Sequence, residues 1–372
     1  MLKKLKEIVL FLFMLLLVFS CVKKNNDSVN ISTETIKDSM NRDIKLPVNI
    51  YRIICSGAGA LRYITYMRCQ DAVIAVDDME KRRSKLDARP YAFAYSHLKE
   101  LPMFGEFRGN DNPELISALN PGPDIIFKTY GEAGYNPVEL QEKTGIPVVV
   151  LDYGDLGANK EVFYRTMDLI GKVMRRENRA AKMKQFIDDI ISDLDKRTKD
   201  IESRKTCYIG GVSYKGPLGL QSTEPGYPPF VFLNTPNAAI DSANSQFTHM
   251  DVSKEKIVEW DPEIIFIDLA TMQSEQKANA LYELKTDPAY KSLQVVKSGN
   301  IYGVLPYNWY TQNHGSTLAN AYYIGKILYP DRFKDIDPIQ KADEIYTFLI
   351  GKPVFNEMNE SFNGMGYKKL EL

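Results

Sequence analysis

Two similar segments lie about 140 residues apart in the chain, one at Asn112–Phe127 and the other at Ser253–Phe266. Each has a short helical stretch with a Glu in its first turn, then a Pro-acid pair, then a run of β-branched and aromatic residues. Such a run is typical of a buried strand. A helix–strand unit that occurs twice predicts two lobes of like architecture.

Short apolar strands alternate with helices on both sides of the chain's middle. Strands are expected at residues 51–56, 72–76, 124–128 and 148–151, and again at 206–209, 264–268 and 301–304. Helices are expected at residues 60–67, 113–119, 137–144, 253–259, 315–328 and 338–349. A hairpin with its turn at residues 39–41 precedes them. This alternation predicts parallel βαβ units.

The middle of the chain, residues 160–204, has apolar residues at helical spacing and charged residues elsewhere. It predicts one long helix, or two helices joined near residues 176–178. We therefore expect an α/β fold of two Rossmann-like βαβ lobes joined by one long rigid connecting helix. The expected boundaries are residues 33–160, 161–200 and 201–372.

The N-terminus has the three parts of a secretory signal peptide. Lysines at positions 3, 4 and 6 precede an apolar run at residues 8–19, and Ser20 precedes Cys21. The run is shorter than the roughly 20 residues of a membrane span. We expect a signal peptide at residues 1–20 and a polar tether at 21–32, so the protein works outside the cytoplasm. An ordinary secreted protein, or a signal anchor with an incidental cysteine, is the alternative.

Charge and cysteine content exclude two classes of protein. The net charge of −1 lacks the basic excess of a nucleic-acid-binding protein. After Cys21 only Cys55, Cys69 and Cys207 remain, and an odd count cannot form a complete disulfide framework. Cys55 and Cys207 lie in apolar, strand-like runs and are expected to be buried thiols, although a Cys55–Cys69 bridge is an alternative.

No set of catalytic residues is evident. The three histidines, His97, His249 and His314, are far apart, so HExxH-type zinc chemistry is excluded. The segment 211–216 has Lys215 where a GxSxG nucleophile elbow needs glycine, which leaves Ser213 as a weak nucleophile candidate. We expect a binding protein without turnover and without a cofactor.

These features together resemble a known family. Residues 17–21 resemble a lipobox, the cleavage site of bacterial lipoproteins, and residues 36–47, 112–127, 253–266 and 298–304 are similar to segments of one lipoprotein family. It comprises the substrate-binding lipoproteins of ABC importers for iron chelates and cobalamin, class III periplasmic binding proteins with a helical backbone. Residues 210–230 resemble a branch associated with iron uptake.

The resemblance implies a function and partners. A monomer would capture an iron complex, such as a ferric siderophore-like chelate, between its lobes and deliver it to the membrane permease. Glu114 and Glu255, one in each lobe, match the family's surface carboxylates that pair with permease arginines, whereas elsewhere they would only be favourable charges in a first helical turn. Cys21 would carry the lipid that holds the protein on the outer face of the membrane.

Ligand contacts are expected after the strands, because ligands bind outside the carboxyl ends of parallel strands. A ferric chelate is usually anionic and often aromatic, which favours cationic and aromatic side chains. The candidates are Arg89, Tyr91, Tyr130, Tyr214, Lys215 and Trp309. His314 is either a metal or haem ligand or an ordinary helix residue, and no metal ligands are assigned.

Other functions remain open at this point. The same fold could bind cobalamin, haem or another metal complex. A surface-bound hydrolase or chelatase that uses Ser213, and a structural surface lipoprotein without a small ligand, are alternatives of other classes.

Overall fold

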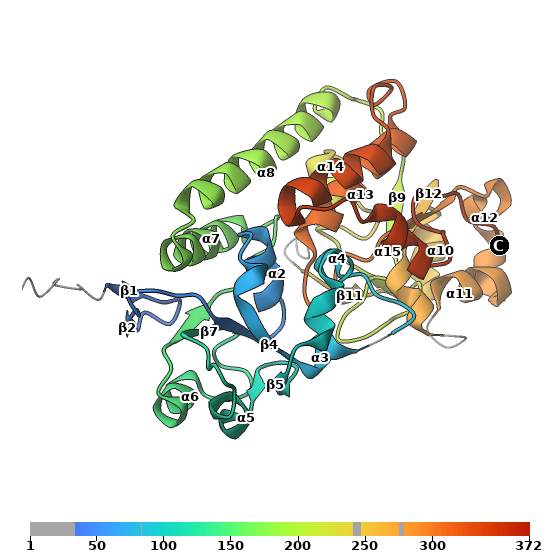
Figure 1. Ribbon diagram of the computed structural model, residues 1–372. Helices are drawn as coiled ribbons and strands as arrows, with labels where there is room; N and C mark the ends of the chain where they lie inside the picture. Colours follow the sequence, from blue (N-terminus) through green and yellow to red (C-terminus); the bar gives the residue numbers. More distant parts are fainter. Residues whose placement is uncertain (1–33, 83, 241–246, 275–278) are drawn as a thin grey trace, which may run out of the picture.

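The computed structural model describes residues 34–372, apart from residue 83 and residues 241–246 and 275–278. Two α/β lobes flank a group of long helices (Figure 1). The N-terminal lobe lies at the lower left of that view and the C-terminal lobe at the right, with helix α8 (Glu177–Thr198) above them. The predicted fold class is confirmed.

The N-terminal lobe contains a six-stranded sheet with the order β6-β5-β4-β3-β7-β8. All neighbouring strands are parallel except β6, which is antiparallel to β5. The strands are β3 (Ile53–Ser56), β4 (Val73–Asp77), β5 (Met103–Glu106), β6 (Asn110–Asp111), β7 (Ile125–Thr129) and β8 (Val148–Leu151). All residues of β3, β7 and β8 are buried, as expected of a parallel sheet with helices on both faces.

Among the described residues, the α-helices of the N-terminal lobe are α2 (Ala60–Tyr66), α3 (Asp78–Lys81), α4 (Pro90–Ala94), α5 (Pro113–Ser117) and α6 (Pro137–Thr144). A two-stranded hairpin, β1 (Thr35–Lys37) and β2 (Asp43–Lys45), precedes the sheet. Its turn is at the predicted place, where Asn41 has a positive φ of 60° and donates its N–H to the Asp38 carbonyl.

The C-terminal lobe contains a parallel three-stranded sheet with the order β13-β12-β9. Its strands are β9 (Cys207–Gly210), β12 (Ile264–Asp268) and β13 (Ile301–Val304), and β10 (Ser222–Thr223) pairs with β11 (Met250–Asp251) nearby. The helices are α9 (Pro228–Phe232), α10 (Lys254–Trp260), α11 (Ala280–Thr286), α12 (Gln294–Ser298) and α13 (His314–Leu328).

Two helices, not one, occupy the middle of the chain. Helix α7 (Lys160–Met174) ends at Arg175, whose φ of 54° breaks the helical geometry, and α8 then provides a 22-residue connector. Helices α14 (Pro338–Ile350) and α15 (Phe355–Ser361) return to the N-terminal lobe and contact α4, and α14 also contacts α2. The lobe boundaries at residues 160 and 201 stay predictions.

The described cysteines are all buried and free, so Cys55 and Cys69 do not pair. Cys21, the expected lipidation site, lies outside the described residues. Within the described part of the chain, no helix is long and apolar enough to cross a membrane.

Candidate ligand-binding cleft between the lobes

The carboxyl ends of the two parallel sheets border one cavity of about 380 Å³. From the N-terminal lobe, residues that follow β3, β4 and β5 line it: Ala58, Met79, Arg82, Phe107 and Arg108. From the C-terminal lobe, residues that follow β9, β12 and β13 line it: Ser213, Lys215, Gly216, Gln273, Asn308, Trp309, Tyr310 and Thr311. This is where ligands are expected in open α/β sheets.

The charged residues that line this cavity are all cationic. Arg82 is neutralised by Asp78, with 2.9 Å between guanidinium and carboxylate. Arg108 and Lys215, one from each lobe, have no carboxylate at ion-pair distance among the described residues. Each lies over an aromatic ring at 5.1 Å, Arg108 over Phe107 and Lys215 over Tyr214. The cavity therefore presents positive charge that no carboxylate of the described residues compensates.

Backbone conformations that disfavour ordinary side chains gather around the same cavity. Positive φ angles occur at Arg108 (62°), Lys215 (56°), Tyr310 (50°) and Thr311 (63°), and at Tyr130 (54°) beside them. Each such residue costs roughly 1–3 kcal/mol and persists only where the surrounding structure holds it, and such strain is enriched at binding sites. Arg108 and Lys215 therefore lie in turns that the surrounding structure must hold in place.

The C-terminal lobe's cleft loop is tied to the N-terminal lobe by a buried arginine. Arg62 on α2 donates from Nη2 to the Trp309 carbonyl at 2.9 Å and from Nη1 to the Tyr310 carbonyl at 3.1 Å. It also donates to the Tyr153 hydroxyl at 2.7 Å, and Tyr153 donates to the Gln312 carbonyl at 2.8 Å. These bonds fix the loop that carries the aromatic wall of the cavity.

Two further side-chain contacts join the lobes beside the cavity. The Tyr310 hydroxyl donates to Asp77 at the end of β4, and the hydroxyls of Tyr130 and Thr311 are 2.9 Å apart. Burial, and then the neighbouring Glu80 carboxylate, raise the pKa of Asp77 from 3.8 to about 7. Asp77 is therefore a titratable contact between the lobes.

Four of the six predicted ligand residues lie in or beside the cavity. Lys215 and Trp309 line it. Tyr130 and Tyr214 lie next to lining residues and are 43% and 42% exposed, and the Tyr214 ring stacks on His249 with 4.2 Å between centroids.

Arg89 and Tyr91 do not line the cavity, and we remove them from the candidate site. Both are buried inside the N-terminal lobe. Arg89 donates to Asp87 at 2.8 Å and to Glu80 at 2.7 Å, and Tyr91 donates to Glu80 at 2.6 Å. Their polar groups are used by these carboxylates, so they are free neither to meet an anion nor to stack on a ligand.

His314 does not reach the cavity either. Its ring is 1% exposed, stacks on Phe163 with 4.3 Å between centroids, and has Nε2 at 2.8 Å from the Gly154 carbonyl. Burial lowers the pKa of His314 to about 3, so the ring is neutral. Among the described residues no group of three or more His, Cys, Asp or Glu side chains is placed to bind a metal ion.

The sequence reasoning missed Arg108 and Phe107. Arg108 lies in the turn between β5 and β6, and neither strand was predicted. The Gly109–Asn110 pair is a turn signal that would have placed this arginine at a strand end. Asn308 donates to the Ser213 carbonyl at 2.7 Å and so joins two lining segments. Ser213 itself donates to the Gly216 carbonyl at 2.9 Å within its own turn.

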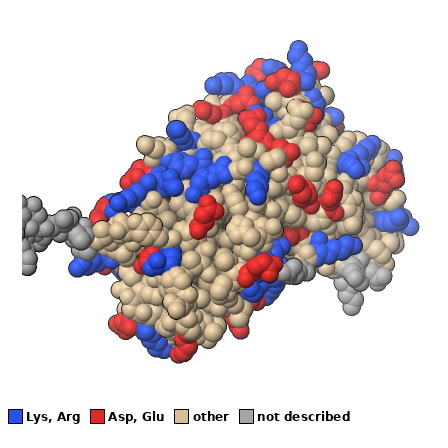
Figure 2. Space-filling model, in the orientation of Figure 1, with Lys and Arg blue, Asp and Glu red and all other residues tan. Residues whose placement is uncertain are grey.

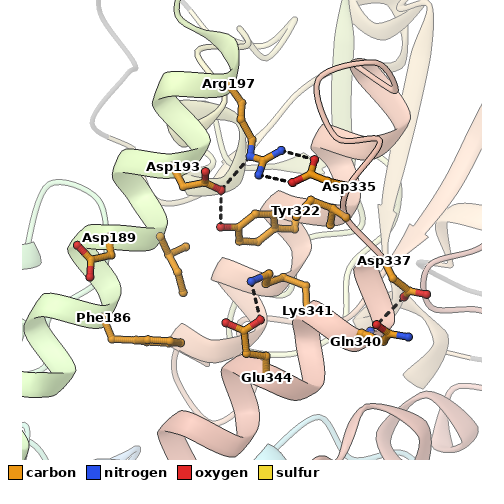
Figure 3. A pocket seen from close by; sticks show the side chains of 12 residues that line it. Phe186, Asp189, Asp193, Arg197, Tyr322, Asp335, Asp337, Gln340, Lys341 and Glu344 are labelled. Carbon is orange, nitrogen blue, oxygen red and sulfur yellow. Dashed lines mark hydrogen bonds and ion pairs between the residues drawn. The ribbon is translucent and has the colours of Figure 1, made fainter.

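A larger cavity, about 600 Å³, lies between α8 and α14 (Figure 3). Five carboxylates and two cations line it. Arg197 pairs with Asp193 and Asp335, and Lys341 pairs with Glu344, whereas Asp189 and Asp337 form no ion pair with a described residue. In Figure 2, acidic and basic side chains are mixed toward the upper end of α8, and basic ones gather toward α7. The lining of the larger cavity is therefore acidic overall, so this groove lacks the positive charge that the cleft offers to an anion.

Comparison with known proteins places the chain in a family. A family model described as periplasmic binding protein matches residues 75–307, more than half of the chain. The molybdate-binding protein MolA of Haemophilus influenzae is 20% identical over 358 residues, which covers 89% of this chain and 94% of that protein. The structure of MolA bound to molybdate matches with a TM-score of 0.64 at 18% identity, over 86% of this chain and 98% of that chain.

Two other solved structures share the fold. An ABC transporter solute binding protein from Sulfurospirillum deleyianum matches with a TM-score of 0.61 and 23% identity, covering 88% of this chain and 98% of that one. CeuE of Helicobacter pylori with Ni(II) bound matches with a TM-score of 0.55 and 18% identity, covering 86% and 96%. The chain belongs to the periplasmic binding protein family, and it is a non-enzymatic solute-binding protein of an ABC transporter.

Proposed function

We propose that the cleft binds an anionic metal complex, with a ferric siderophore-like chelate as the first candidate, and delivers it to the permease. The observation that carries this proposal is a pair of cations, Arg108 and Lys215, that line one cavity from opposite lobes and have no carboxylate partner among the described residues. An anion between them would form charge-assisted hydrogen bonds with both lobes, and such bonds are stronger than neutral ones. Binding would thereby favour closure of the cleft.

The size and walls of the cavity favour a chelate over a bare oxyanion. A volume of about 380 Å³ falls in the range of small-molecule sites. Phe107, Trp309 and Tyr310 supply aromatic surface for the organic part of a chelate. The residues that line the cavity include no histidine, so haem would lack that axial ligand there.

A metal oxyanion is the second candidate. The relative MolA is named for molybdate and its solved structure contains it, and the match extends over 94% of that protein's length. A tetrahedral oxyanion would use the same two cations and leave the aromatic walls unused.

Isothermal titration of the purified protein separates the candidates. We expect binding of an anionic ferric tris-catecholate and no binding of an uncharged ferric hydroxamate of similar size. Tight binding of molybdate without binding of either chelate would establish the second candidate. Equal affinity for the charged and uncharged chelates would contradict the role of the two cations.

Charge-removing variants test the observation directly. Arg108→Gln and Lys215→Gln should each weaken anion binding by roughly tenfold or more, because each loses one charge-assisted hydrogen bond. The control is Lys291→Gln, which removes an exposed charge of the C-terminal lobe far along the chain from the cavity's lining segments. A loss as large in the control as in the two variants would point to long-range charge instead of contact.

The location of the protein follows partly from the family, whose members are periplasmic. We propose that Cys21 carries a lipid that tethers the protein near its permease. A tether raises the effective concentration of loaded receptor at the membrane.

A further inference from the structure

Arg108 lies in a turn whose shape is unusual for its residues. Strands β5 and β6 pair with Gly105 opposite Asp111 and Glu106 opposite Asn110, so residues 107–109 connect them. Arg108 and Gly109 both have positive φ, 62° and 74°. Glycine adopts this conformation at no steric cost, but arginine does not. Something other than local preference must therefore hold Arg108 in place.

A buried lysine lies directly beneath this turn. The Lys128 side chain, from β7, is fully buried and donates from Nζ to the Gly109 carbonyl at 2.8 Å. It also donates to Asp111 Oδ2 at 2.7 Å and to Ser56 Oγ at 3.3 Å. These bonds connect the turn and β6 to the ends of the neighbouring strands β7 and β3.

The turn and the lysine fit each other closely. A Cβ atom on Gly109 would lie 2.5 Å from Lys128 Nζ, so only glycine leaves room for the ammonium group. The Gly109 carbonyl also accepts the Tyr135 N–H at 2.7 Å, and Asp78 accepts the Phe107 N–H at 2.6 Å. The backbone on both sides of Arg108 is thus held by bonds to other segments.

Stability alone does not account for a fully buried Lys128–Asp111 pair. Replacing such a pair with apolar residues is often neutral or stabilising, because desolvation of two charges is costly. The pair contributes one thing that an apolar replacement would lack, a donor for the Gly109 carbonyl. Since Asp111 balances the charge of Lys128, the lysine also sits under the cleft without adding net charge next to Arg108.

We propose that Lys128 is a positioning residue for ligand binding: it holds the turn at residues 107–109 so that Arg108 faces the cleft. The proposal rests on the proposed function, because it needs an anion that Arg108 meets. Lys128 itself does not line the cavity and would not touch the ligand. It would act through backbone geometry, as pre-organised binding groups require support from the residues behind them.

The test removes the donor without leaving a buried charge. Lys128→Met combined with Asp111→Asn removes both charges, so the fold should survive, while the Gly109 carbonyl loses its lysine donor. Ser56→Ala removes the other side-chain partner of Lys128 but keeps the Lys128–Asp111 pair and the donor for Gly109, so it is the matched control. With ferric tris-catecholate and molybdate as probes, we expect about tenfold weaker binding in the double variant and little change in the control.

Combination with the cation variants distinguishes positioning from general damage. Adding Arg108→Gln to the double variant should cause little further loss, because the positioned group is gone, whereas adding Lys215→Gln should lower the affinity by its usual factor. The proposal would be overturned if Arg108→Gln and Lys215→Gln each lowered the affinity of the double variant by the same factor as in the wild-type protein. If Arg108→Gln alone leaves binding unchanged, the proposed function fails at that residue instead.

A second readout does not depend on the ligand. Backbone amides of residues 107–110 should exchange hydrogen faster in the double variant than in Ser56→Ala, while the amides of β7 and β8 stay protected. Unchanged exchange across the turn would overturn the proposal even if neither probe binds to the wild-type protein.

Discussion

At the scale of single residues, Asp77 joins the two lobes by a hydrogen bond and also has a raised pKa. Its Oδ1 atom accepts the Glu80 N–H at 3.1 Å at the start of α3, and its other oxygen accepts the Tyr310 hydroxyl. Burial raises its pKa to about 7, well above its usual 3.8. The folded protein therefore binds a proton there between about pH 4 and 7 that the unfolded chain does not bind.

This shift predicts a pH dependence of stability. The contribution of Asp77 to the free energy of unfolding is fully present below about pH 4 and is lost as the pH rises to about 7. The side chain of the Asp77→Asn variant cannot ionise. Its free energy of unfolding should therefore fall less than that of the wild-type protein between about pH 4 and 7, with a difference of at most roughly 4 kcal/mol. Burial also raises the pKa of Asp268 to about 7. The variant should therefore keep the part of the pH dependence of stability that Asp268 causes.

Urea unfolding at pH 4.5, 6.0 and 7.5 measures the effect. The matched control is Asp331→Asn, an exposed aspartate in the loop before α14, which should follow the wild-type slope. An Asp77→Asn slope equal to that of the control would contradict the assigned shift.

Single residues also show where sequence reasoning failed. Arg89 and Lys215 both follow strands and both are cationic, so the sequence treats them alike. Only the folded chain shows that Glu80 and Asp87 surround Arg89, whereas no described carboxylate pairs with Lys215. Whether a charge is free depends on contacts made after folding, which residue type and position along a strand do not determine.

At the scale of elements, buried strands were predictable and an edge of the sheet was not. Strands β7 and β12 each begin with two isoleucines and a phenylalanine, an apolar run that is typical of a parallel sheet covered on both faces. Strand β5 has two buried residues between exposed ones, and one of the two is Gly105. A Cβ there would lie 2.7 Å from the Asn110 carbonyl, so the pairing needs a residue that is a poor strand signal.

The C-terminal end of α14 is held by arginines of other elements. Arg179 on α8 donates to the Phe348 carbonyl at 2.6 Å and the Leu349 carbonyl at 3.2 Å. Arg68, just after α2, donates to the Thr347 carbonyl at 2.7 Å. The last carbonyls of a helix lack partners within the helix and carry partial negative charge. These bonds therefore join the connector, the N-terminal lobe and the C-terminal helix.

We expect Arg179→Met to destabilise the protein by about 2 kcal/mol, since buried carbonyls lose a charged donor. The measurement is the free energy of unfolding in urea. Lys182→Met is the control, because Lys182 is exposed on the same helix and forms no ion pair with a described residue. Equal destabilisation in both variants would mean that the arginine contributes only charge to α8.

At the scale of the whole molecule, the cleft combines segments that are distant in sequence. Arg108 and Lys215 follow strands of different sheets, β5 and β9. The repeated helix–strand unit predicted only that two such sheets exist. The same repeat places Glu114 on α5 and Glu255 on α10, one in each lobe and both exposed. The architecture was thus readable from the sequence, whereas the pairing of surfaces across the cleft was not.

The two glutamates are not needed to start their helices. Asn112 accepts the Leu115 N–H at 2.9 Å at the start of α5, and Ser253 accepts the Lys256 N–H at 3.2 Å at the start of α10. The N-caps are therefore made by other side chains. Neither glutamate is in an ion pair with a described residue. Both carboxylates are free to meet cations of a partner, which favours docking on the permease over a purely local role.

We predict that Glu114→Ala combined with Glu255→Ala lowers solute uptake severalfold and leaves ligand affinity unchanged, because exposed charges set the orientation of docking and do not touch the cleft. The control removes two other exposed glutamates, Glu142 on α6 and Glu259 on α10, which keeps the change in net charge equal.

Uptake is measured in cells, and affinity by titration of the purified variants. Normal uptake by the Glu114/Glu255 double variant would remove the docking role, and a parallel loss of affinity would show that the substitutions act on the cleft instead. Salt screens exposed ion pairs, so the docking contact of the wild-type protein should weaken as the salt concentration rises. Uptake by the wild-type protein should therefore fall with rising salt.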